Sequence, residues 1–301
     1  MKALIRRTAS LLLVLALVLS AGIAFPAMAA DGQEGQPAEI KQSGQTEESS
    51  EKPLTDAEKQ ALAIKKYGKY KGTNASRIPV LTYHNVVTDK VKRNRYSGDT
   101  TVISKSNFEK QMRWLKRNGY RTINCEEFYL WYKGKIKLPK KSVLITMDDA
   151  REGVAENALP ILKKYKLKAT SFVIGAWTLK GKDGYMEYDV MRKIQKDYPD
   201  LEFQSHTYNL HTPKASLSGY AKALKDAKKQ KARYGFEFLA YPYGRNNDQM
   251  VKAYKKAGIR MAFTYGRYGS GYATRKQDQY RIKRIKVEGN FSMAQFRSIF
   301  S

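Results

Sequence analysis

Apolar and polar positions follow two alternating patterns between Ile78 and Val287. Short uninterrupted apolar runs, such as "SVLIT" at 142–146, have the composition of strands that are buried on both faces. Between these runs lie stretches whose apolar residues recur every three or four positions, which is the period of a helix with one buried side. Because strand-like and helix-like segments alternate, the pattern predicts an α/β fold with a mostly parallel sheet covered by helices.

The same pattern predicts the individual elements. We expect strands at 78–87, 142–146, 168–177, 201–205, 237–241, 261–264 and 280–287. We expect helices at 106–119, 153–167, 189–197, 220–234 and 250–257, the first of them opened by a capping box at Ser106. Six to eight such units in about 225 residues fit a single barrel domain, whose sites lie at the carboxyl ends of the strands.

The first 29 residues have the pattern of a secretory signal peptide. A basic start is followed by an apolar run from Ala9 to Phe25, a proline, and an Ala-Met-Ala sequence at 27–29 that suits cleavage. The alternative is an uncleaved N-terminal membrane anchor, because the apolar run approaches the roughly 17 to 25 residues that a span needs. We therefore expect a secreted, extracellular protein that is associated with the cell envelope.

Residues 30–76 form the predicted linker between the signal peptide and the barrel. From Asp31 to Gln60 the chain has eight acids, three lysines and no aromatic residue, a composition typical of disorder. Thr55 followed by Glu58 forms a capping box that opens a short helix to about Lys66. We therefore expect an acidic, disordered linker that ends in this helix, and a folded catalytic domain at 77–301.

The rest of the chain is strongly basic. The protein has a net charge of +28, and residues 61–301 alone carry about +30, because the acidic linker outweighs the three basic residues of the signal peptide. This part is long enough to bury a large core, so its basic charge does not indicate disorder. The charge instead indicates an anionic partner, and we expect anionic cell-envelope polymers. No zinc-finger, ribonucleoprotein or helix-turn-helix pattern supports nucleic acid, and we expect a monomer. Six basic residues at 222–233 form either a binding stripe or a solvated helix face, and we favour the second.

Residues suited to acid–base or metal chemistry follow three of the apolar runs. His84 follows "VLTY", Asp148 and Asp149 follow "SVLITM", and His206 and His211 follow "LEFQS". Each signal is weak alone, because an aspartate after a strand is often a turn residue and a lone histidine is often structural. Together, two imidazoles and one carboxylate suit a catalytic Zn²⁺ or a similar metal and leave a position for water. The second carboxylate is then free to take a proton from that water, which makes a hydrolase.

The spacing of His206 and His211 has a structural consequence. A helix turns by about 100° per residue and a strand alternates its faces, so neither brings side chains five positions apart together. If the two histidines act together, an irregular loop at the end of a strand must hold them.

Three motifs resemble those of the polysaccharide deacetylase superfamily, carbohydrate esterase family 4. They are "SVLITMDDAREGVAENALPILKKYKLKATSFVI", "SHTYNLH" and "LAYPYG". The resemblance covers roughly Ile78 to Val287. The histidine spacing, "AYPYG" and the Tyr-His pair after the first apolar run are similar to the exported branch that acts on poly-β-1,6-N-acetylglucosamine.

The resemblance implies a distorted (β/α) barrel that removes acetyl groups from an N-acetylglucosamine polymer with a divalent metal. Zn²⁺ is the preferred metal, with Co²⁺, Ni²⁺ or Mn²⁺ as alternatives. By motif, Asp148 is expected to be the general base, and the backbone N–H of Tyr243 is expected to hold the oxyanion. The metal ligands are expected to be Asp149, His206 and His211. His84 is expected to act as the acid or as a substrate contact.

The chain also departs from the family pattern. Met147 replaces a Phe, and Ala150 replaces a Gly at a position where a positive φ would strain Ala. Ala240 stands where the family has an Arg that steadies the base, and no histidine after His211 supplies the usual late acid. Two alternatives therefore stay open: a catalytically silent polysaccharide- or wall-binding protein on the same barrel, and an acetyl-xylan esterase with the same mechanism.

Overall fold

The computed structural model describes residues 54–301, which belong to one compact unit. The predicted signal peptide and most of the predicted linker lie outside the described residues. Within 54–301, no helix combines the length and the apolar character that a membrane span requires. The capping box is present, because the Thr55 hydroxyl accepts the N–H of Glu58 and the Glu58 side chain accepts the N–H of Thr55.

The strands are mostly short. In chain order they are β1 Arg77–Ile78, β2 Val80–Tyr83, β3 Asn85–Val87, β4 Val102–Ser104, β5 Arg121–Ile123, β6 Ser142–Met147, β7 Ala169–Val173, β8 Leu201–Ser205, β9 Phe238–Ala240, β10 Met261–Phe263, β11 Ala273–Thr274 and β12 Ile285–Lys286. Two small pairs lie outside the main sheet: β1 with β11, antiparallel, and β3 with β4, parallel.

The main sheet has eight strands and curls into a distorted (β/α) barrel. Its order is β10-β9-β8-β7-β6-β2-β12, with β5 also paired to β6, and every pairing is parallel. The chain leading into β12 joins the two edges: Ile282 bridges Phe263 of β10, and Ile285 pairs with Leu81 of β2. The predicted fold class, strand number and strand direction are confirmed.

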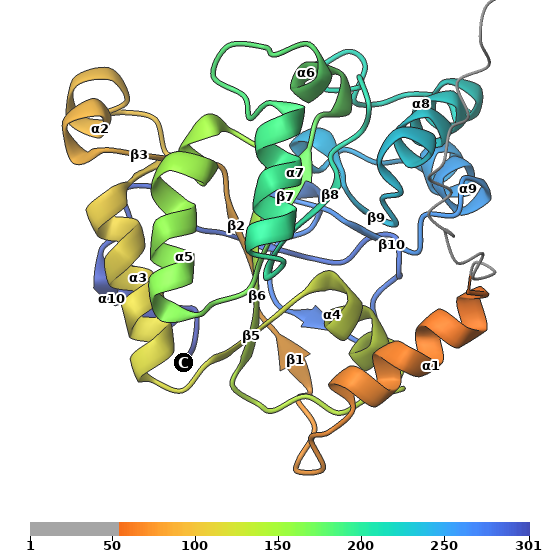
Figure 1. The fold of residues 1–301 in the computed structure, drawn as a ribbon, viewed down its shortest axis with the longest axis horizontal. Coiled ribbons are helices and arrows are strands. Elements are labelled where there is room, and N and C mark those ends of the chain that lie inside the picture. The colour runs from red at the N-terminus through yellow and green to blue at the C-terminus, as the bar shows by residue number, and fades with distance from the viewer. Residues whose placement is uncertain (1–53) are drawn as a thin grey trace, which may run out of the picture. The chain divides into compact units, whose positions relative to one another are not determined.

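Ten α-helices lie in the described part of the chain. They are α1 Asp56–Tyr67, α2 Asp89–Arg95, α3 Lys105–Arg117, α4 Cys125–Tyr132, α5 Leu159–Tyr165, α6 Gly175–Leu179, α7 Tyr188–Asp197, α8 Tyr220–Tyr234, α9 Asp248–Lys256 and α10 Met293–Ser298. Figure 1 shows α3 beside α5 on one side and α8 beside α9 on the other, with α2 and α6 at the end drawn uppermost. A π-helical turn, Val154–Ala158, precedes α5.

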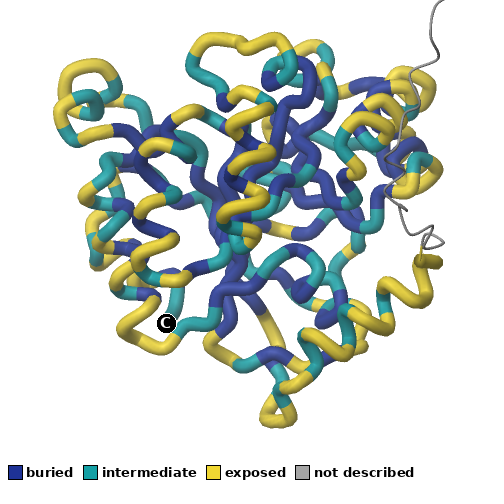
Figure 2. Tube along the Cα trace, viewed as in Figure 1, coloured by how far each residue is buried: buried dark blue, intermediate teal, exposed yellow. Residues whose placement is uncertain are grey.

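Buried residues are concentrated on the strands (Figure 2). All six residues of β6 are buried, as its apolar run predicts. Inside the barrel the ring of Phe263 lies 5.7 Å from that of Phe172 and 5.7 Å from that of Phe128 on α4, measured between centroids. A second buried cluster packs the other face of the sheet against α3, α5 and α7. This packing makes the barrel a rigid support for residues at the strand ends.

Two predicted elements, β8 and α8, have their predicted bounds, whereas several others are wrong in detail. The strand expected at 168–177 ends at Val173, and residues 175–177 belong to α6. The first strand is divided, because Pro79 has no N–H to pair and separates β1 from β2. The capping residue of α3 is Ser104, not Ser106, because the Ser104 hydroxyl accepts the N–H of Asn107. The expected strand at 280–287 is regular only over β12.

Candidate metal centre

Two strand ends bring three polar residues to the same rim of the barrel. Asp149 follows β6, His206 follows β8, and His211 lies in the loop that leads to α8. Strands β6 and β8 both pair with β7 in parallel, so their carboxyl ends meet at one rim. One ligand atom from each of the three residues lies within 4.8 Å of the other two.

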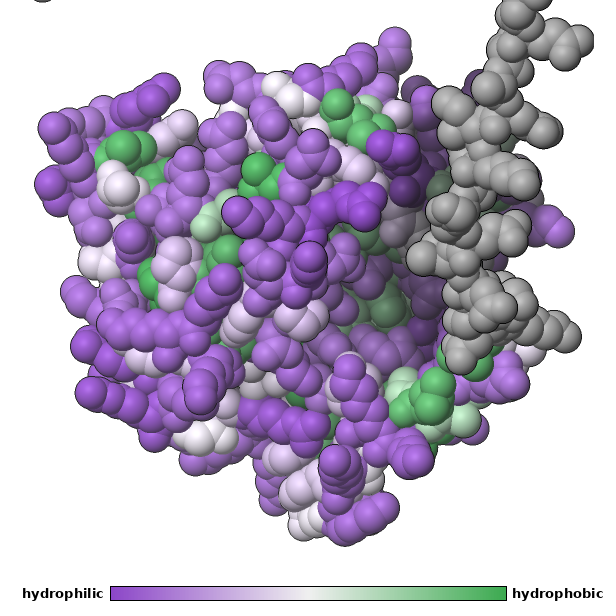
Figure 3. Space-filling view, in the orientation of Figure 1, coloured by the Kyte–Doolittle hydropathy of each residue, from purple (hydrophilic) through white to green (hydrophobic). Residues whose placement is uncertain are grey.

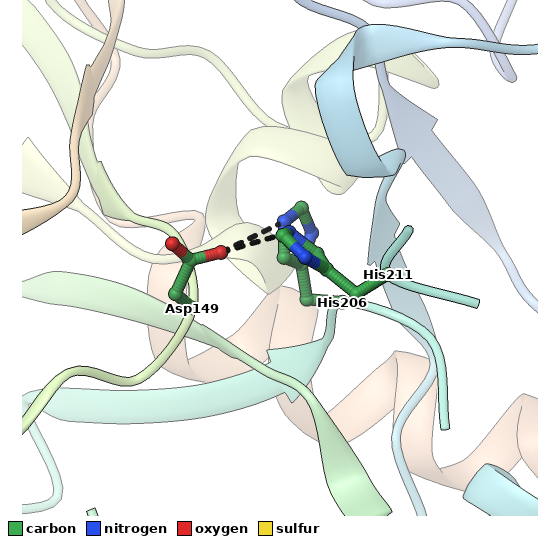
Figure 4. A group of neighbouring side chains, drawn as sticks. All are labelled: Asp149, His206 and His211. Atoms are coloured by element: carbon green, nitrogen blue, oxygen red, sulfur yellow. Dashed lines mark ion pairs between the residues drawn. The ribbon is translucent and has the colours of Figure 1, made fainter. Parts of the chain in front are cut away.

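Both imidazoles point at the carboxylate of Asp149 (Figure 4). Nε2 of His211 lies 3.0 Å and Nε2 of His206 lies 3.4 Å from Oδ1 of Asp149. The other ring nitrogen of His206, Nδ1, donates a 2.8 Å hydrogen bond to the carbonyl oxygen of Ala240. That bond turns the lone pair of His206 Nε2 toward Asp149, whose Oδ1 atom is buried and accepts no hydrogen bond from the described residues.

A bound cation suits this arrangement. A carboxylate oxygen and imidazole lone pairs repel one another unless a proton or a metal ion lies between them. Burial alone would raise the pKa of Asp149, but the two histidines hold that pKa well below its ordinary value, so the carboxylate is charged. Two neutral imidazoles and one carboxylate are a common ligand set for Zn²⁺ and related divalent metals. The residues present therefore fit a divalent metal.

Asp148, next to Asp149 in the chain, forms a buried ion pair. Arg284 binds its carboxylate with two hydrogen bonds, Nη1 to Oδ1 and Nη2 to Oδ2, each 2.8 Å long. Burial acts to raise the pKa of Asp148, but the adjacent charge of Arg284 outweighs it and leaves the pKa below its ordinary value. Asp148 is therefore an anion next to Asp149 of the three-residue cluster.

Arg284 was not predicted from the sequence. The expected arginine position is Ala240, and the arginine that contacts Asp148 comes instead from a different segment, just before β12. The guanidinium is further held by the carbonyl oxygen of Thr264 at 2.9 Å and the hydroxyl of Thr146 at 3.1 Å. A signal was present in the sequence: Arg284 shares the buried, alternating face of this segment with Ile282, and an arginine on an apolar face needs a partner.

His84 also reaches the rim, from the end of β2. It lines a cavity of about 190 Å³ together with Asp149, Tyr96 and Arg151. Burial lowers the pKa of His84 below its ordinary value, so its ring is neutral at neutral pH. Its ring centroid lies 5.8 Å from that of Tyr265 in an edge-on contact.

Tyr243 lies in the turn Pro242–Gly244 that follows β9. Its side chain is 43% exposed, and its ring centroid lies 5.0 Å from that of His211. Trp177 of α6, which the sequence analysis did not single out, lies 5.2 Å from His211. The imidazole of His211 is thus in contact with two aromatic rings.

The backbone around the centre is strained. Five non-glycine residues in the described chain have positive φ, and four of them surround the cluster: Asp149 at 75°, Ala150 at 50°, Thr207 at 70° and Tyr243 at 57°. The predicted strain at Ala150 is therefore present. Strain of this kind persists only where the surrounding structure enforces it, and it is concentrated at functional sites.

Comparison with known proteins identifies the family. The family model described as polysaccharide deacetylase matches residues 135–262. A poly-β-1,6-N-acetyl-D-glucosamine N-deacetylase of Staphylococcus aureus (strain MSSA476) is 34% identical over 203 residues, which are 62% of this chain and 67% of that protein. This chain belongs to the polysaccharide deacetylase family.

Solved structures agree with the fold of this deacetylase. A Streptococcus pyogenes deacetylase in complex with acetate has a TM-score of 0.63 at 24% identity, covering 76% of this chain and all of that one. A polysaccharide deacetylase from Bacillus cereus has a TM-score of 0.60 at 26% identity, covering 75% of this chain and 69% of that one. The resemblance stated from the motifs is confirmed, and the deacetylase is a hydrolase of carbon–nitrogen bonds other than peptide bonds.

Proposed function

We propose that this deacetylase removes N-acetyl groups from a β-linked N-acetylglucosamine polymer of the cell envelope or biofilm matrix. The convergence of Asp149, His206 and His211 on one point, with a buried acidic neighbour, is the observation that supports hydrolysis with a divalent metal. The name of the S. aureus relative supports the substrate. Zn²⁺ is the metal that this ligand set favours, with Co²⁺, Ni²⁺ and Mn²⁺ as alternatives.

Each polar residue at the rim has a proposed role. Asp149, His206 and His211 would hold the metal, which when bound supplies Lewis acidity and lowers the pKa of water. Asp148 takes the proton from the water whose oxygen attacks the acetyl carbon, and Arg284 keeps the carboxylate of Asp148 in place. The backbone N–H of Tyr243 donates a hydrogen bond to the developing oxyanion. The bond between carbon and nitrogen then breaks, giving acetate and a free amine.

His84 is the proposed proton donor to the leaving amine, or a contact to the substrate. Its position at the cavity beside Asp149 suits both roles. The pH dependence of turnover distinguishes the two roles. If His84 is the acid, the enzyme loses activity as the pH rises through the lowered pKa of His84. The pH profile of the His84→Asn variant tests this: loss of the alkaline limb indicates the acid, and a raised KM with an unchanged profile indicates the contact.

The central experiment measures free amine released from β-1,6-linked N-acetylglucosamine oligomers, with and without a metal chelator. We expect turnover that is lost on chelation, restored by Zn²⁺ or Co²⁺, and absent from Asp148→Asn. Activity that survives both metal removal and Asp148→Asn would reject the mechanism. Acetylated xylan oligomers assayed in parallel test the esterase alternative, and tight glycan binding without bound metal or turnover would favour a silent binding protein.

We also propose that the basic surface holds the enzyme at anionic envelope polymers. Lys222, Lys225 and Lys228 are exposed on α8, in agreement with a solvated helix face. Figure 3 shows hydrophilic residues over most of one face, with apolar patches that are small and separate. Cosedimentation with anionic wall polymer should therefore weaken steeply as salt rises. Secretion, a monomeric state and the absence of nucleic-acid binding stay predictions, tested by fractionation, light scattering and a gel-shift assay.

A further inference from the structure

The two histidines of the centre are held in different ways. The backbone N–H of His206 bonds to the carbonyl oxygen of Val173 on β7, 2.8 Å away, and its ring bonds to Ala240, so the sheet fixes this residue. His211 lies five residues later in an irregular loop, and its ring contacts Asp149, Trp177 and Tyr243. The position of His211 therefore depends on what holds the loop.

One buried carboxylate holds the middle of that loop. Asp226, on α8, accepts the backbone N–H of Tyr208 at Oδ1 and the backbone N–H of Asn209 at Oδ2, each over 2.8 Å. Its side chain has no other hydrogen bond and forms no salt bridge with the described residues, and Asp226 is only 8% exposed. Burying a carboxylate without an ionic partner is costly, so its use here requires a compensating role.

We propose that Asp226 is a positioning residue that sets the path of the loop between the histidines and so aims His211 at the metal. The loop has other contacts: the Thr207 N–H bonds to the Ser205 hydroxyl, and the Leu210 N–H bonds to the Thr207 hydroxyl. From α6, Gly175 and Ala176 donate to the carbonyl oxygens of Thr207 and Tyr208. Thr207 already has a φ of 70°. Without Asp226, the N–H groups of Tyr208 and Asn209 lose their acceptor, and the strained loop loses these hydrogen bonds to α8. This proposal rests on the proposed metal role of His211.

The chain offers a graded pair of variants. In Asp226→Asn, one amide oxygen still accepts one of the two N–H groups, whereas the amide nitrogen faces the other as a second donor. In Asp226→Ala, both acceptors are lost. Asp189→Asn, an acid-to-amide change at an exposed position of α7, is the matched control.

The test measures metal affinity directly, by competition of Zn²⁺ and Co²⁺ with a chromophoric chelator, at a temperature where circular dichroism shows each variant to be folded. We expect affinity to fall in the order wild type, Asp226→Asn, Asp226→Ala, with a loss of roughly 10- to 100-fold for the last, and no change for Asp189→Asn. The visible spectrum of the Co²⁺ form should change with the geometry of the site. In turnover, excess metal should restore kcat of the Asn variant while KM for the glycan stays at the wild-type value.

The outcomes separate the two proposals. Folded Asp226 variants with wild-type metal affinity would overturn the positioning role and leave the metal mechanism intact. A wild-type protein that binds no divalent metal would overturn the mechanism and the positioning role together. If Asp226→Ala does not fold, the Asn variant alone decides, because it keeps the shape of the side chain.

Discussion

At the scale of single residues, the centre depends on charges that the fold removes from water. Asp148 is 2% exposed and Arg284 is completely buried. A buried pair of this kind adds little net stability, but removing one partner leaves the other charge uncompensated. The proposed chemistry therefore depends on both Asp148 and Arg284, because Asp148 stays a buried anion only beside Arg284. Only Asp148 is proposed to touch the reacting water.

Arg284→Met tests this dependence. We expect the free energy of unfolding to fall by about 3 to 5 kcal/mol, because the Asp148 carboxylate stays buried without its partner. The double variant with Asp148→Asn should recover part of that loss, since the charge is then absent. Urea denaturation measures both. Arg281→Lys, at a partly exposed ion pair, is the control and should change stability by less than about 0.5 kcal/mol.

Asp226 predicts a specific pH dependence of stability. Burial raises the pKa of Asp226 from 3.8 to about 6, although the positive charges of Lys222 and Lys229 on α8 act to lower it. Tyr254 of α9 is another titratable group nearby. Because the folded protein binds this proton more tightly than the unfolded chain, the stabilisation is complete below about pH 4 and is lost as the pH rises through 6.

The shift corresponds to a free energy on the order of 3 kcal/mol. Between pH 4 and pH 7 the unfolding free energy of wild type should therefore fall relative to that of Asp226→Asn, which has no titratable group at position 226. Chemical denaturation across this range measures the difference. Parallel pH profiles for the two proteins would contradict the prediction.

At the scale of elements, close backbone contacts determine the position of the segment that follows Asp148 and Asp149. The π-helical turn Val154–Ala158 lies against β3, and Gly153 at its start has an ordinary φ of −60°. A Cβ atom at Gly153 would overlap the carbonyl oxygen of Val86 and the side-chain oxygen of Asn85. Glycine is required here by space and not by backbone conformation.

Gly153→Ala should therefore destabilise the protein by roughly 1 to 3 kcal/mol, the usual effect of overpacking. Gly98→Ala is the matched control, because a Cβ atom there meets no other atom within 4 Å. Thermal unfolding of the two variants gives the comparison. An equal effect at both positions would show that the loss of glycine itself, and not the contact with β3, is responsible.

At the scale of the whole molecule, the rim collects residues from distant parts of the chain. His84 comes from β2, the aspartates from β6, the histidines from β8 and its loop, and Arg284 from the segment that joins the barrel edges. Since the proposed metal binds only when these parts are assembled, its binding energy adds to the stability of the entire fold.

Addition of Zn²⁺ at a hundredfold excess over its Kd should stabilise the protein by about 2.7 kcal/mol, which raises Tm by roughly 5 to 10 °C for a domain of this size. A chelator should reverse the shift. His211→Ala and Asp149→Asn should lose it, and the exposed Asp189→Asn should keep it. Differential scanning calorimetry at fixed protein concentration is the measurement, and an identical Tm with and without metal would reject the site.

Local physics determined much of this protein from sequence alone. The apolar run of β6 and the periodicity of α8 depend on neighbours a few residues apart, so they predicted the α/β fold. The resemblance of the three motifs to a known family predicted the family and the ligand set Asp149, His206 and His211. The contacts of Arg284 and Asp226 were not predictable in this way. Arg284 lies 136 residues from Asp148, and Asp226 reaches backbone N–H groups that carry no mark in the sequence. Only the closure of the barrel and the packing of α8 beneath the loop brought these partners together, because burial and distance are properties of the folded chain.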